Sequence, residues 1–202
     1  MILSNQECHT LPIVLASASP RRLQLLQQIG ITPQFVLATD IDETPLKQER
    51  PAIYVQRLSK TKLLAGQAML TTNIPFILAA DTVVAVGNRI LNKTTDPKQA
   101  VTYLKLLSGR RHRVCTSVVL MNRQTGRIAS RLVYTVVQFS RLTDRQCQTY
   151  LASNEWQDKA GAYAIQGKAA SFIKAIHGSH SNVVGLPLFE TAQLLRGFGL
   201  IP

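Results

Sequence analysis

Short apolar runs alternate with amphipathic segments along the chain, and this pattern predicts both strands and helices. Residues 12–16 (PIVLA) predict a buried strand. A helix is predicted directly after it, because Ser19-Pro20 offers an N-cap and a favoured first helical residue, and Gly30 stands where the helix would end. A second helix is predicted over about 51–70 from its apolar spacing. The chain therefore opens as strand, turn and helix.

Strand patterns dominate the middle of the chain. Apolar or β-like runs occupy five segments, which are residues 76–80, 82–86, 90–91, 113–121 and 127–139. The first of them ends on Asp81. The last two flank residues 122–126, a turn with glycine at its end, and this arrangement predicts a hairpin.

Three more helices and one short strand complete the pattern. The helices are predicted over 96–109, 143–151 and 187–195, and residues 171–176 are strand-like. No repeat and no linker divides the chain, so we expect one domain over residues 1–202. Because strands and helices interleave throughout, the sequence predicts an α/β layered domain with a mixed sheet.

Composition excludes a disordered chain and adds a strong positive charge. Hydrophobic residues make up 46% of the 202 and charged residues 17%, whereas disorder requires low hydrophobicity. Lysine and arginine number 23 against 11 acidic residues, and the formal net charge of +12 attracts nucleic acid, membrane surfaces or phosphorylated small molecules. No acidic residue lies between Pro97 and Thr143. Charge alone does not choose among these partners.

The cysteines and the apolar runs predict a cytoplasmic protein. Cys8, Cys115 and Cys147 are an odd number at wide spacing, which is typical of free thiols in a reducing compartment, and the last two lie in apolar patterns typical of a core. The first ten residues have no secretory signal, and no apolar run is long enough for a membrane-spanning helix. We therefore expect no membrane partner.

The segment Ser17-Ala18-Ser19-Pro20-Arg21-Arg22 is a candidate phosphate site. It lies at a strand-to-helix turn, where unpaired backbone N–H groups and the helix dipole favour an anion. Two guanidinium groups can clamp a phosphate, and they oppose the dipole unless an anion binds. The alternative is a plain Ser-Pro N-cap followed by two solvated arginines.

Acidic residues supply candidate metal ligands and a candidate base. Asp81 at the end of an apolar strand could hold a divalent metal or accept a proton from water, or else cap the following turn. Asp40, Asp42 and Glu43 offer oxygen ligands for Mg²⁺ or Mn²⁺. The alternative for these three is a solvated acidic loop.

Two glycine-containing segments near the C-terminus are further candidates. Residues 158–168 (DKAGAYAIQGK) permit close backbone approach to a ligand, Gln166 could read a base edge, and Lys159 and Lys168 could contact phosphates. Residues 178–188 (GSHSNVVGLPL) form a polar loop before a helix. A surface loop and a helix-entry loop are the respective alternatives.

Other motif classes are absent from the sequence. The four histidines, His9, His112, His177 and His180, show no metal-ligand spacing, so we expect surface or packing roles for them. GxSxG, HExxH, GxxxxGK[ST] and GxGxxG do not occur, which argues against serine hydrolases, zincins, P-loop NTPases and dinucleotide enzymes.

Seven segments together resemble the Maf family of nucleoside triphosphate pyrophosphatases, over about Val14 to Gly199. They read LASASPRRLQLL, DIDET, RLSKTK, AADTVV, ILNK, DKAGAYAIQG and GSHSNVVGLPL. The resemblance implies a two-lobed α/β fold with a long mixed β-sheet and a deep central cleft, related to inosine triphosphatases. It also implies hydrolysis of a nucleoside triphosphate to monophosphate and pyrophosphate with a divalent cation, a homodimer, and a house-cleaning role tied in the family to cell-division arrest.

The resemblance assigns roles to individual residues. Asp81 matches the proton acceptor and Glu43 the acid on the metal side, so a metal is expected at these two carboxylates. Ser17, Arg21 and Arg22 match the phosphate-binding turn, and Lys62 and Lys93 match two substrate-binding lysines of the cleft.

Three residues place the chain in one branch of the family. Arg21, Thr82 and Gln166 stand where the branch that prefers dTTP and UTP has its specificity residues, and the second branch prefers 7-methyl-GTP. One departure concerns residues 92–94, which read Asn-Lys-Thr instead of the usual Gly-Lys-Pro. This departure changes the backbone options around Lys93.

Two rival interpretations stay open. The first is a nucleic-acid-binding or division-regulating protein without essential catalysis, which the net charge of +12 favours. Against nucleic acid, aromatic residues make up only 6% of the chain and are not interleaved with the basic residues. The second is a pyrophosphatase of the 7-methyl-GTP branch.

Overall fold

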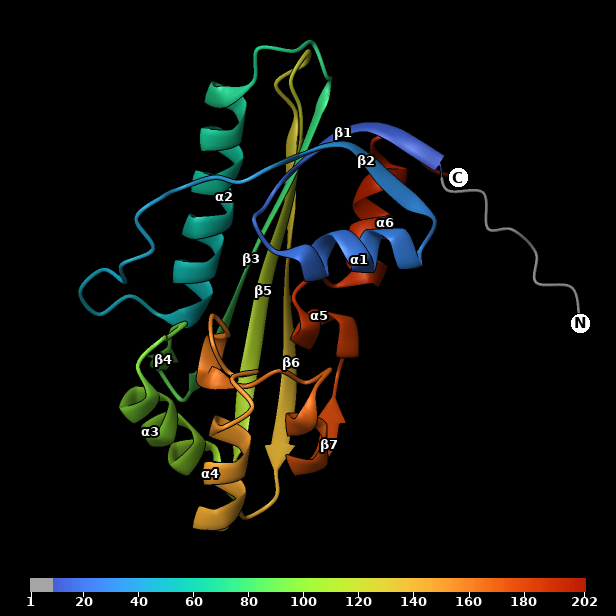
Figure 1. The fold of residues 1–202 in the computed structure, drawn as a ribbon. Helices are drawn as coiled ribbons and strands as arrows, with labels where there is room; N and C mark the ends of the chain where they lie inside the picture. Colours follow the sequence, from blue (N-terminus) through green and yellow to red (C-terminus); the bar gives the residue numbers. More distant parts are fainter. Residues whose placement is uncertain (1–8) are drawn as a thin grey trace, which may run out of the picture.

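One mixed sheet organises residues 9–202, the part of the chain that this computed structural model describes (Figure 1). Its strands are β1 (His9–Ala16), β2 (Ile31–Leu37), β3 (Phe76–Val86), β4 (Arg89–Leu91), β5 (Arg111–Asn122), β6 (Ile128–Phe139) and β7 (Ile173–His177). They lie in the order β2-β1-β3-β5-β6-β7, with β4 beside β3. β1 runs parallel to β2 and β3, and the other pairs are antiparallel. The predicted mixed sheet and hairpin are confirmed.

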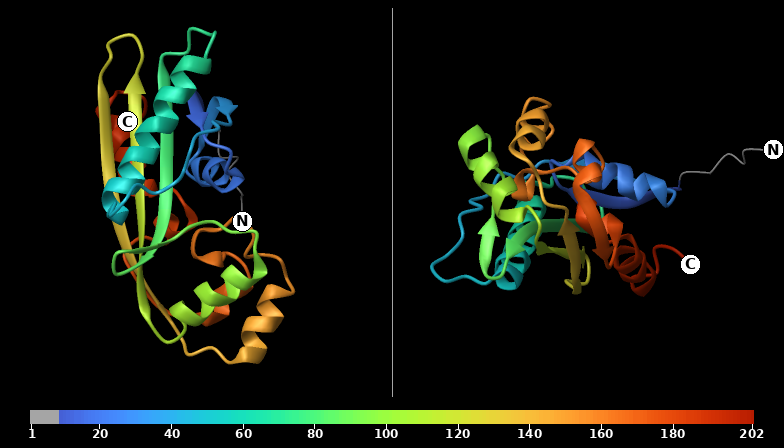
Figure 2. Two further views of the ribbon diagram at one scale, coloured as in Figure 1. Left: turned by 90° about the vertical axis from the view of Figure 1, so that its left-hand side faces the viewer. Right: turned by 90° about the horizontal axis from the view of Figure 1, so that it is seen from below.

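Helices cover the sheet unevenly and create two lobes (Figures 1 and 2). They are α1 (Pro20–Gln28), α2 (Pro51–Met69), α3 (Pro97–Leu107), α4 (Asp144–Leu151), α5 (His180–Val184) and α6 (Leu188–Gly197), with 3-10 turns η1 (Ala160–Ala162) and η2 (Lys168–Phe172). α2 packs on one face of β3 and β5, and α1, α5 and α6 pack on the other. α3 and α4 pack together at the far end of the long strands, where they form the second lobe.

Local signals in the sequence explain where the helices begin and end. At the start of α3 the Asp96 side chain accepts a hydrogen bond from the Lys98 N–H. At the start of α4, Thr143 and Gln146 form a capping box. Gly30 follows α1 with a φ of 74°, a backbone conformation that favours glycine. These helices confirm the predictions made from the same residues.

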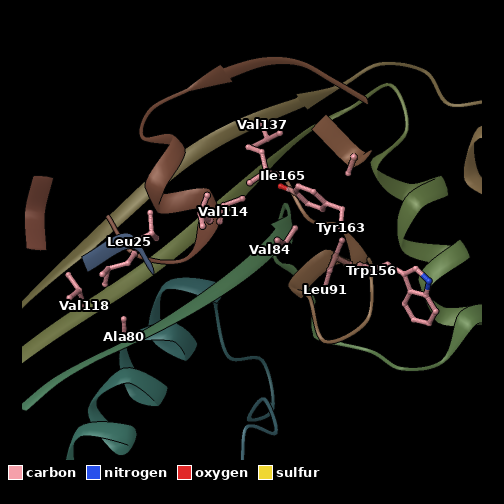
Figure 3. Packing of buried hydrophobic residues seen from close by; sticks show 14 of the residues in the cluster. Leu25, Ala80, Val84, Leu91, Val114, Val118, Val137, Trp156, Tyr163 and Ile165 are labelled. Carbon is pink, nitrogen blue, oxygen red and sulfur yellow. The ribbon is translucent and has the colours of Figure 1, made fainter. Parts of the chain in front are cut away.

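The hydrophobic core lies on both faces of the sheet. The larger cluster joins Val84, Val114 and Val137 of the strands to residues that precede and form the 158–166 segment. Figure 3 shows Tyr163 and Ile165 of that segment packed over the strands that carry Val114 and Val137. A segment that contains a glycine and several polar residues is therefore fixed in place by its buried side chains.

The two described cysteines are free and buried, as the apolar pattern predicts. Cys115 lies in β5 and Cys147 in α4. Burial raises the pKa of both thiols, that of Cys115 to about 11, which disfavours the reactive thiolate. The prediction for Cys8 and that for the His9 side chain lie outside the described residues.

The structure differs from the sequence predictions at three places. β3 is one continuous strand, so Asp81 lies in its middle and not at a strand end, because residues 81 and 82 keep their pairing with Ser117 and Thr116 of β5. β2 was not predicted, since Pro33 disguises it; proline is tolerated there because β2 lies at the sheet edge. The strand-like residues 171–176 divide between η2 and β7.

Candidate active site

Two adjoining cavities open beside β3, and residues from both ends of the sequence line them. The first lies between the turn after β1 and the 158–166 segment, and the second lies between β3 and the loop before α2. Residues common to both are Glu43, Thr82, Lys93 and Ala160. Every residue to which the family resemblance assigned a site role lines one of the two cavities: Ser17, Arg21, Arg22, Glu43, Lys62, Asp81, Thr82, Lys93 and Gln166.

A buried ion-pair cluster stands at the centre of the site. The Lys62 Nζ lies 2.5 Å from Asp81 Oδ1 and 2.7 Å from Glu43 Oε1. Lys62 on α2 is 5% exposed and Asp81 on β3 is 4% exposed, so both charges are withdrawn from water. Such burial requires a partner of opposite charge. The alternative role for Asp81, a turn cap, is excluded because it lies inside a strand.

Glu43 links this cluster to a second lysine. Its Oε2 lies 2.9 Å from the Nζ of Lys93, whose side chain is about half exposed. Partial burial opposes the ionised form of Glu43, but the hydrogen bonds and charges of Lys62 and Lys93 outweigh it and lower its pKa to about 2. Lys93 therefore reaches the site even though Asn and Thr replace the usual Gly and Pro beside it.

Of the clustered acids, only Glu43 enters the site. Asp40 and Asp42 are exposed and line neither cavity, and Asp42 accepts a hydrogen bond from the Thr44 N–H. These two match the solvated-loop alternative. Within residues 9–202 no group of three or more His, Cys, Asp or Glu side chains is placed to hold a metal. A cation here would have the carboxylates of Glu43 and Asp81 as its protein ligands.

The turn between β1 and α1 holds its two arginines differently. Arg22 is 8% exposed, and its guanidinium donates to the Gly185 carbonyl at 2.8 Å, to Ser17 Oγ at 3.0 Å and to Thr82 Oγ1 at 3.2 Å. Arg21 is only partly buried. The Ser19 side chain does not cap the helix. The alternative of a plain N-cap with two solvated arginines therefore fails.

The first cavity carries uncompensated positive charge. Among residues 9–202, no carboxylate forms an ion pair with Arg21, Arg22 or Lys159, and all three line this cavity. Burial lowers the pKa of each of them, and the charge of Arg21 lowers that of Lys159 further. Cations that destabilise one another in this way are arranged to receive a multiply charged anion.

The 158–166 segment forms the opposite wall of this cavity. It supplies Lys159, Tyr163 and Gln166. The sequence predicted that Lys159 and Gln166 face a ligand, and both line the cavity. The prediction for Lys168 was wrong: its N–H donates to Glu155 Oε2 and its side chain lines a separate groove beside α4. η2 begins at this residue and turns it away from the cavity.

His112 lies behind the same wall and has a packing role, as predicted. It is 2% exposed, its Nε2 is 2.9 Å from the Tyr163 hydroxyl, and its ring stacks edge-on against Phe139 and Tyr163. Burial lowers its pKa to about 4, so the ring is neutral at physiological pH.

Sequence reasoning missed Tyr54 at the site. Its hydroxyl donates to the Glu43 carbonyl at 2.7 Å, and it lines the second cavity. Burial and then the charges of Asp81 and Glu43 raise its pKa, so the hydroxyl keeps its proton. The signal was available, because residues 54, 58 and 62 are spaced by four and share one helix face.

The acid-free stretch of the sequence does not build the site. Its basic residues, which are Lys98, Lys105, Arg110, Arg111, Arg113, Arg123, Arg127, Arg131 and Arg141, line neither cavity. They lie on or beside α3 and the β5–β6 hairpin. The excess positive charge is therefore a property of the molecular surface, where it attracts anions at long range.

Comparison with known proteins places these features in a family. Residues 12–198 match the profile of the family described as Maf-like protein. The chain is 53% identical over 98% of its length to a dTTP/UTP pyrophosphatase of Granulibacter bethesdensis, 98% of which is covered. It is 55% identical over 92% of its length to a dTTP/UTP pyrophosphatase of Gluconobacter oxydans, 86% of which is covered.

A solved structure supports the fold independently. The Ham1 protein of Staphylococcus aureus superposes with a TM-score of 0.53 at 13% identity, covering 94% of this chain and 100% of that one. At this identity the likeness shows the fold alone, and it confirms the predicted α/β architecture. A separate finding concerns membranes: across the described residues, none of the helices is long and apolar enough to span one.

Proposed function

Since this chain belongs to the Maf family, we propose that it is a nucleoside triphosphate pyrophosphatase that hydrolyses dTTP and UTP to the monophosphate and pyrophosphate. The observation that carries the proposal is the placement of a buried carboxylate, Asp81, beside a cavity in which three cations, Arg21, Arg22 and Lys159, form no ion pair with any acidic residue among residues 9–202. Modified pyrimidine nucleotides belong to the same substrate class.

The cations are proposed to bind and orient the triphosphate. Arg21 and Lys159 face each other across the first cavity, and Arg22 and Ser17 lie at the N-terminal turn of α1. Backbone N–H groups and the dipole of that helix add to the attraction for phosphate oxygens. Fixing a flexible polyanion in this way accounts for much of the rate in phosphoryl transfer.

Asp81 is proposed to take the proton from the attacking water. Its carboxylate is buried on β3, and the contact with the ammonium of Lys62 holds it in one orientation. Lys62 also contacts Glu43. When the triphosphate binds, its phosphate oxygens are proposed to become further partners of the Lys62 ammonium. The water is proposed to attack the α-phosphorus, and pyrophosphate leaves with the charge that the cavity cations neutralise.

A divalent cation, Mg²⁺ or Mn²⁺, is proposed to be held by Glu43 and Asp81. The two carboxylates fit such an ion because one ammonium contacts both, which shows that they lie close together, and carboxylate oxygens suit these hard cations. Two protein ligands leave room for phosphate oxygens and water. When bound, the metal supplies charge neutralisation to the triphosphate.

The pyrimidine preference is proposed to depend on Arg21, Thr82 and Gln166. All three line the first cavity, with Arg21 and Gln166 on opposite walls. The amide of Gln166 offers both a donor and an acceptor, which suits the edge of a pyrimidine base. We propose a cytoplasmic site of action, where free nucleotides are found; the homodimer, the absence of nucleic acid binding and the link to division arrest stay predictions.

Pyrophosphate release from a panel of nucleotides tests this function. The panel contains dTTP, UTP, CTP, GTP, 7-methyl-GTP and ITP, each with Mg²⁺ and with Mn²⁺. We expect release from dTTP and UTP that Asp81→Asn lowers by about 10²–10⁴-fold, the usual contribution of a general base. Asp42→Asn is the matched control, because Asp42 lies outside both cavities although it precedes Glu43 in the sequence. The amide oxygen of Asn can still accept the hydrogen bond from the Thr44 N–H.

Each contrary outcome contradicts a different part of the proposal. Preference for 7-methyl-GTP would retain the chemistry and overturn the roles of Arg21, Thr82 and Gln166. Equal loss in Asp81→Asn and Asp42→Asn would contradict the assignment of the base. No release from folded protein with any nucleotide would reject the enzyme and favour the binding protein without catalysis.

A further inference from the structure

A chain of buried hydroxyl groups runs behind Arg22 and away from the cavity. The guanidinium donates to Thr82 Oγ1 at 3.2 Å, Thr82 Oγ1 lies 3.0 Å from Thr116 Oγ1, and the Thr116 hydroxyl lies 3.2 Å from the carbonyl oxygen of Asn182. Thr82 and Thr116 are directly opposite one another on β3 and β5. Thr116 and Asn182 are both 0% exposed, and neither lines a cavity.

The two ends of this series of hydrogen bonds have defined donor and acceptor roles. A guanidinium only donates and a carbonyl oxygen only accepts. When the Thr116 hydrogen points to the main-chain carbonyl of Asn182, Thr116 Oγ1 accepts the Thr82 hydrogen, whose other acceptor within reach is the Gly185 carbonyl at 3.3 Å. Hydrogen bonds aligned in one direction polarise and strengthen one another in a buried setting.

Asn182 anchors the far end of the chain. Its Nδ2 donates to the Val114 carbonyl at 3.2 Å and to Thr135 Oγ1 at 2.9 Å. Asn182 belongs to α5, and Gly185 at the end of this helix accepts from the Arg22 Nε at 2.8 Å. α5 therefore holds Arg22 twice, directly through Gly185 and indirectly through the two threonines.

We propose that Thr116 and Asn182 are positioning residues that fix the Arg22 guanidinium for triphosphate binding without touching the substrate. Of the five N–H groups of Arg22, three are used within the protein, so two remain for phosphate oxygens. The same geometry assigns Thr82 an indirect role in substrate selection, through Arg22. The proposal rests on the function proposed above, since the ligand of Arg22 is the triphosphate.

Loss of the Thr116 hydroxyl has a specific structural consequence. The Thr82 oxygen also lies 3.3 Å from the Gly185 carbonyl, which is its second available acceptor. Without Thr116 Oγ1 the Thr82 hydrogen turns to Gly185, whose oxygen already accepts from Arg22. Two donors then share this acceptor, and the orientation of the guanidinium is no longer unique.

The experiment compares Thr116→Val, which has nearly the same shape, with Thr116→Ser, which restores the hydroxyl. We expect Thr116→Val to raise the KM for dTTP about tenfold, the upper end of the effect of one lost hydrogen bond between neutral groups, and to change kcat less than twofold. Thr116→Ser should restore the KM. Thr191→Val is the matched control, because Thr191 is also 0% exposed and its hydroxyl donates only to Pro187, outside the site.

A binding measurement separates this proposal from the proposed function. Calorimetry with inorganic tripolyphosphate should show about tenfold weaker binding to Thr116→Val than to the wild-type protein, and no weakening in Thr191→Val. In an Arg22→Lys background, Thr116→Val should cause no further weakening, because the guanidinium group that the threonine hydroxyls orient is absent. Thr116→Ala, which removes the same hydroxyl without a new methyl contact, should repeat the loss.

Several results would overturn the proposal. Unchanged KM and unchanged tripolyphosphate affinity in Thr116→Val would do so, as would equal losses in Thr191→Val or full additivity with Arg22→Lys. If the wild-type protein binds tripolyphosphate but hydrolyses no nucleotide, the proposed function fails and the binding comparison still decides the role of Thr116. Loss of kcat with unchanged KM would also contradict a role through Arg22.

Discussion

Two neighbouring residues of β3 face two different environments. Asp81 points to the α2 side, where charges meet opposite charges in the Glu43–Lys62–Asp81 cluster. Thr82 points to the α1 and α5 side, where Arg22 contacts only hydroxyl and carbonyl oxygens. Successive strand residues project to opposite faces, so a single step along the chain separates an ionic environment from a neutral one.

The difference assigns different tasks to the two sides. On the ionic side Lys62 and Lys93 balance the two carboxylates of Glu43 and Asp81, and these lysines can exchange a carboxylate partner for a phosphate when the substrate arrives. On the hydroxyl side Arg22 has no carboxylate partner, and its hydrogen bonds to hydroxyl and carbonyl oxygens fix only the orientation of its guanidinium group. A fixed, uncompensated cation binds an anion without first breaking an ion pair. The predictions below test this contrast, beginning with the largest effect.

Lys62→Met should be the most destabilising of these changes. It leaves the buried Asp81 without its cation, and we expect the free energy of unfolding to fall by about 3–5 kcal/mol. Adding Asp81→Asn in the same chain should recover most of this loss, because the uncompensated charge disappears. Urea denaturation measures both. A double variant no more stable than Lys62→Met alone would contradict the charge argument.

His112 should make stability depend on pH on the hydroxyl side. Its pKa of about 4 in the folded protein lies below the ordinary value, so its contribution is fully present above about pH 6.5 and is lost as the pH falls through 4. The total loss is about 3 kcal/mol. Urea denaturation of His112→Gln between pH 7 and 4 should show a flatter profile. The exposed His177→Gln is the control, and an equal flattening there would argue against burial as the cause.

Arg21→Ala should weaken substrate binding without weakening the fold. Arg21 forms no ion pair among the described residues, so we expect the free energy of unfolding to change by less than about 0.5 kcal/mol. The KM for dTTP should rise about tenfold, because one charge-assisted contact to phosphate is lost. Steady-state kinetics and urea denaturation of the same preparation decide this. A wild-type KM would remove Arg21 from the phosphate site.

Lys93→Met should have the smallest effect on stability. Its pair with Glu43 is partly exposed, and we expect a loss of less than about 1 kcal/mol at pH 7. The pKa of Glu43 should rise from about 2, since one of its two lysine partners is removed. Carboxyl chemical shifts measured by NMR against pH test this directly. An unchanged Glu43 pKa would show that Lys62 alone sets it.

The sequence by itself determined the elements that depend on local signals. Ser19-Pro20 at the start of α1, Thr143 at the start of α4 and the glycine turn between β5 and β6 predicted elements that the structure confirms, although the Ser19 side chain makes no capping hydrogen bond. The turn at residues 17–22, which its charge marked as a candidate phosphate site, also lines the first cavity. These features are readable because helix caps, turns and hydrophobic periodicity involve residues only a few positions apart.

Only the tertiary structure decided which partner each site residue has. Lys62 contacts Asp81 because α2 packs on β3. Thr82 contacts Thr116, which lies 34 residues later in the sequence, because β5 pairs with β3. Arg22 turns inward because Gly185, from the other end of the sequence, accepts its hydrogen bond. Burial makes an unpaired polar group costly, so each side chain takes the partner that the packing provides. Strand order and packing are set by contacts across the whole chain, beyond the reach of any local pattern.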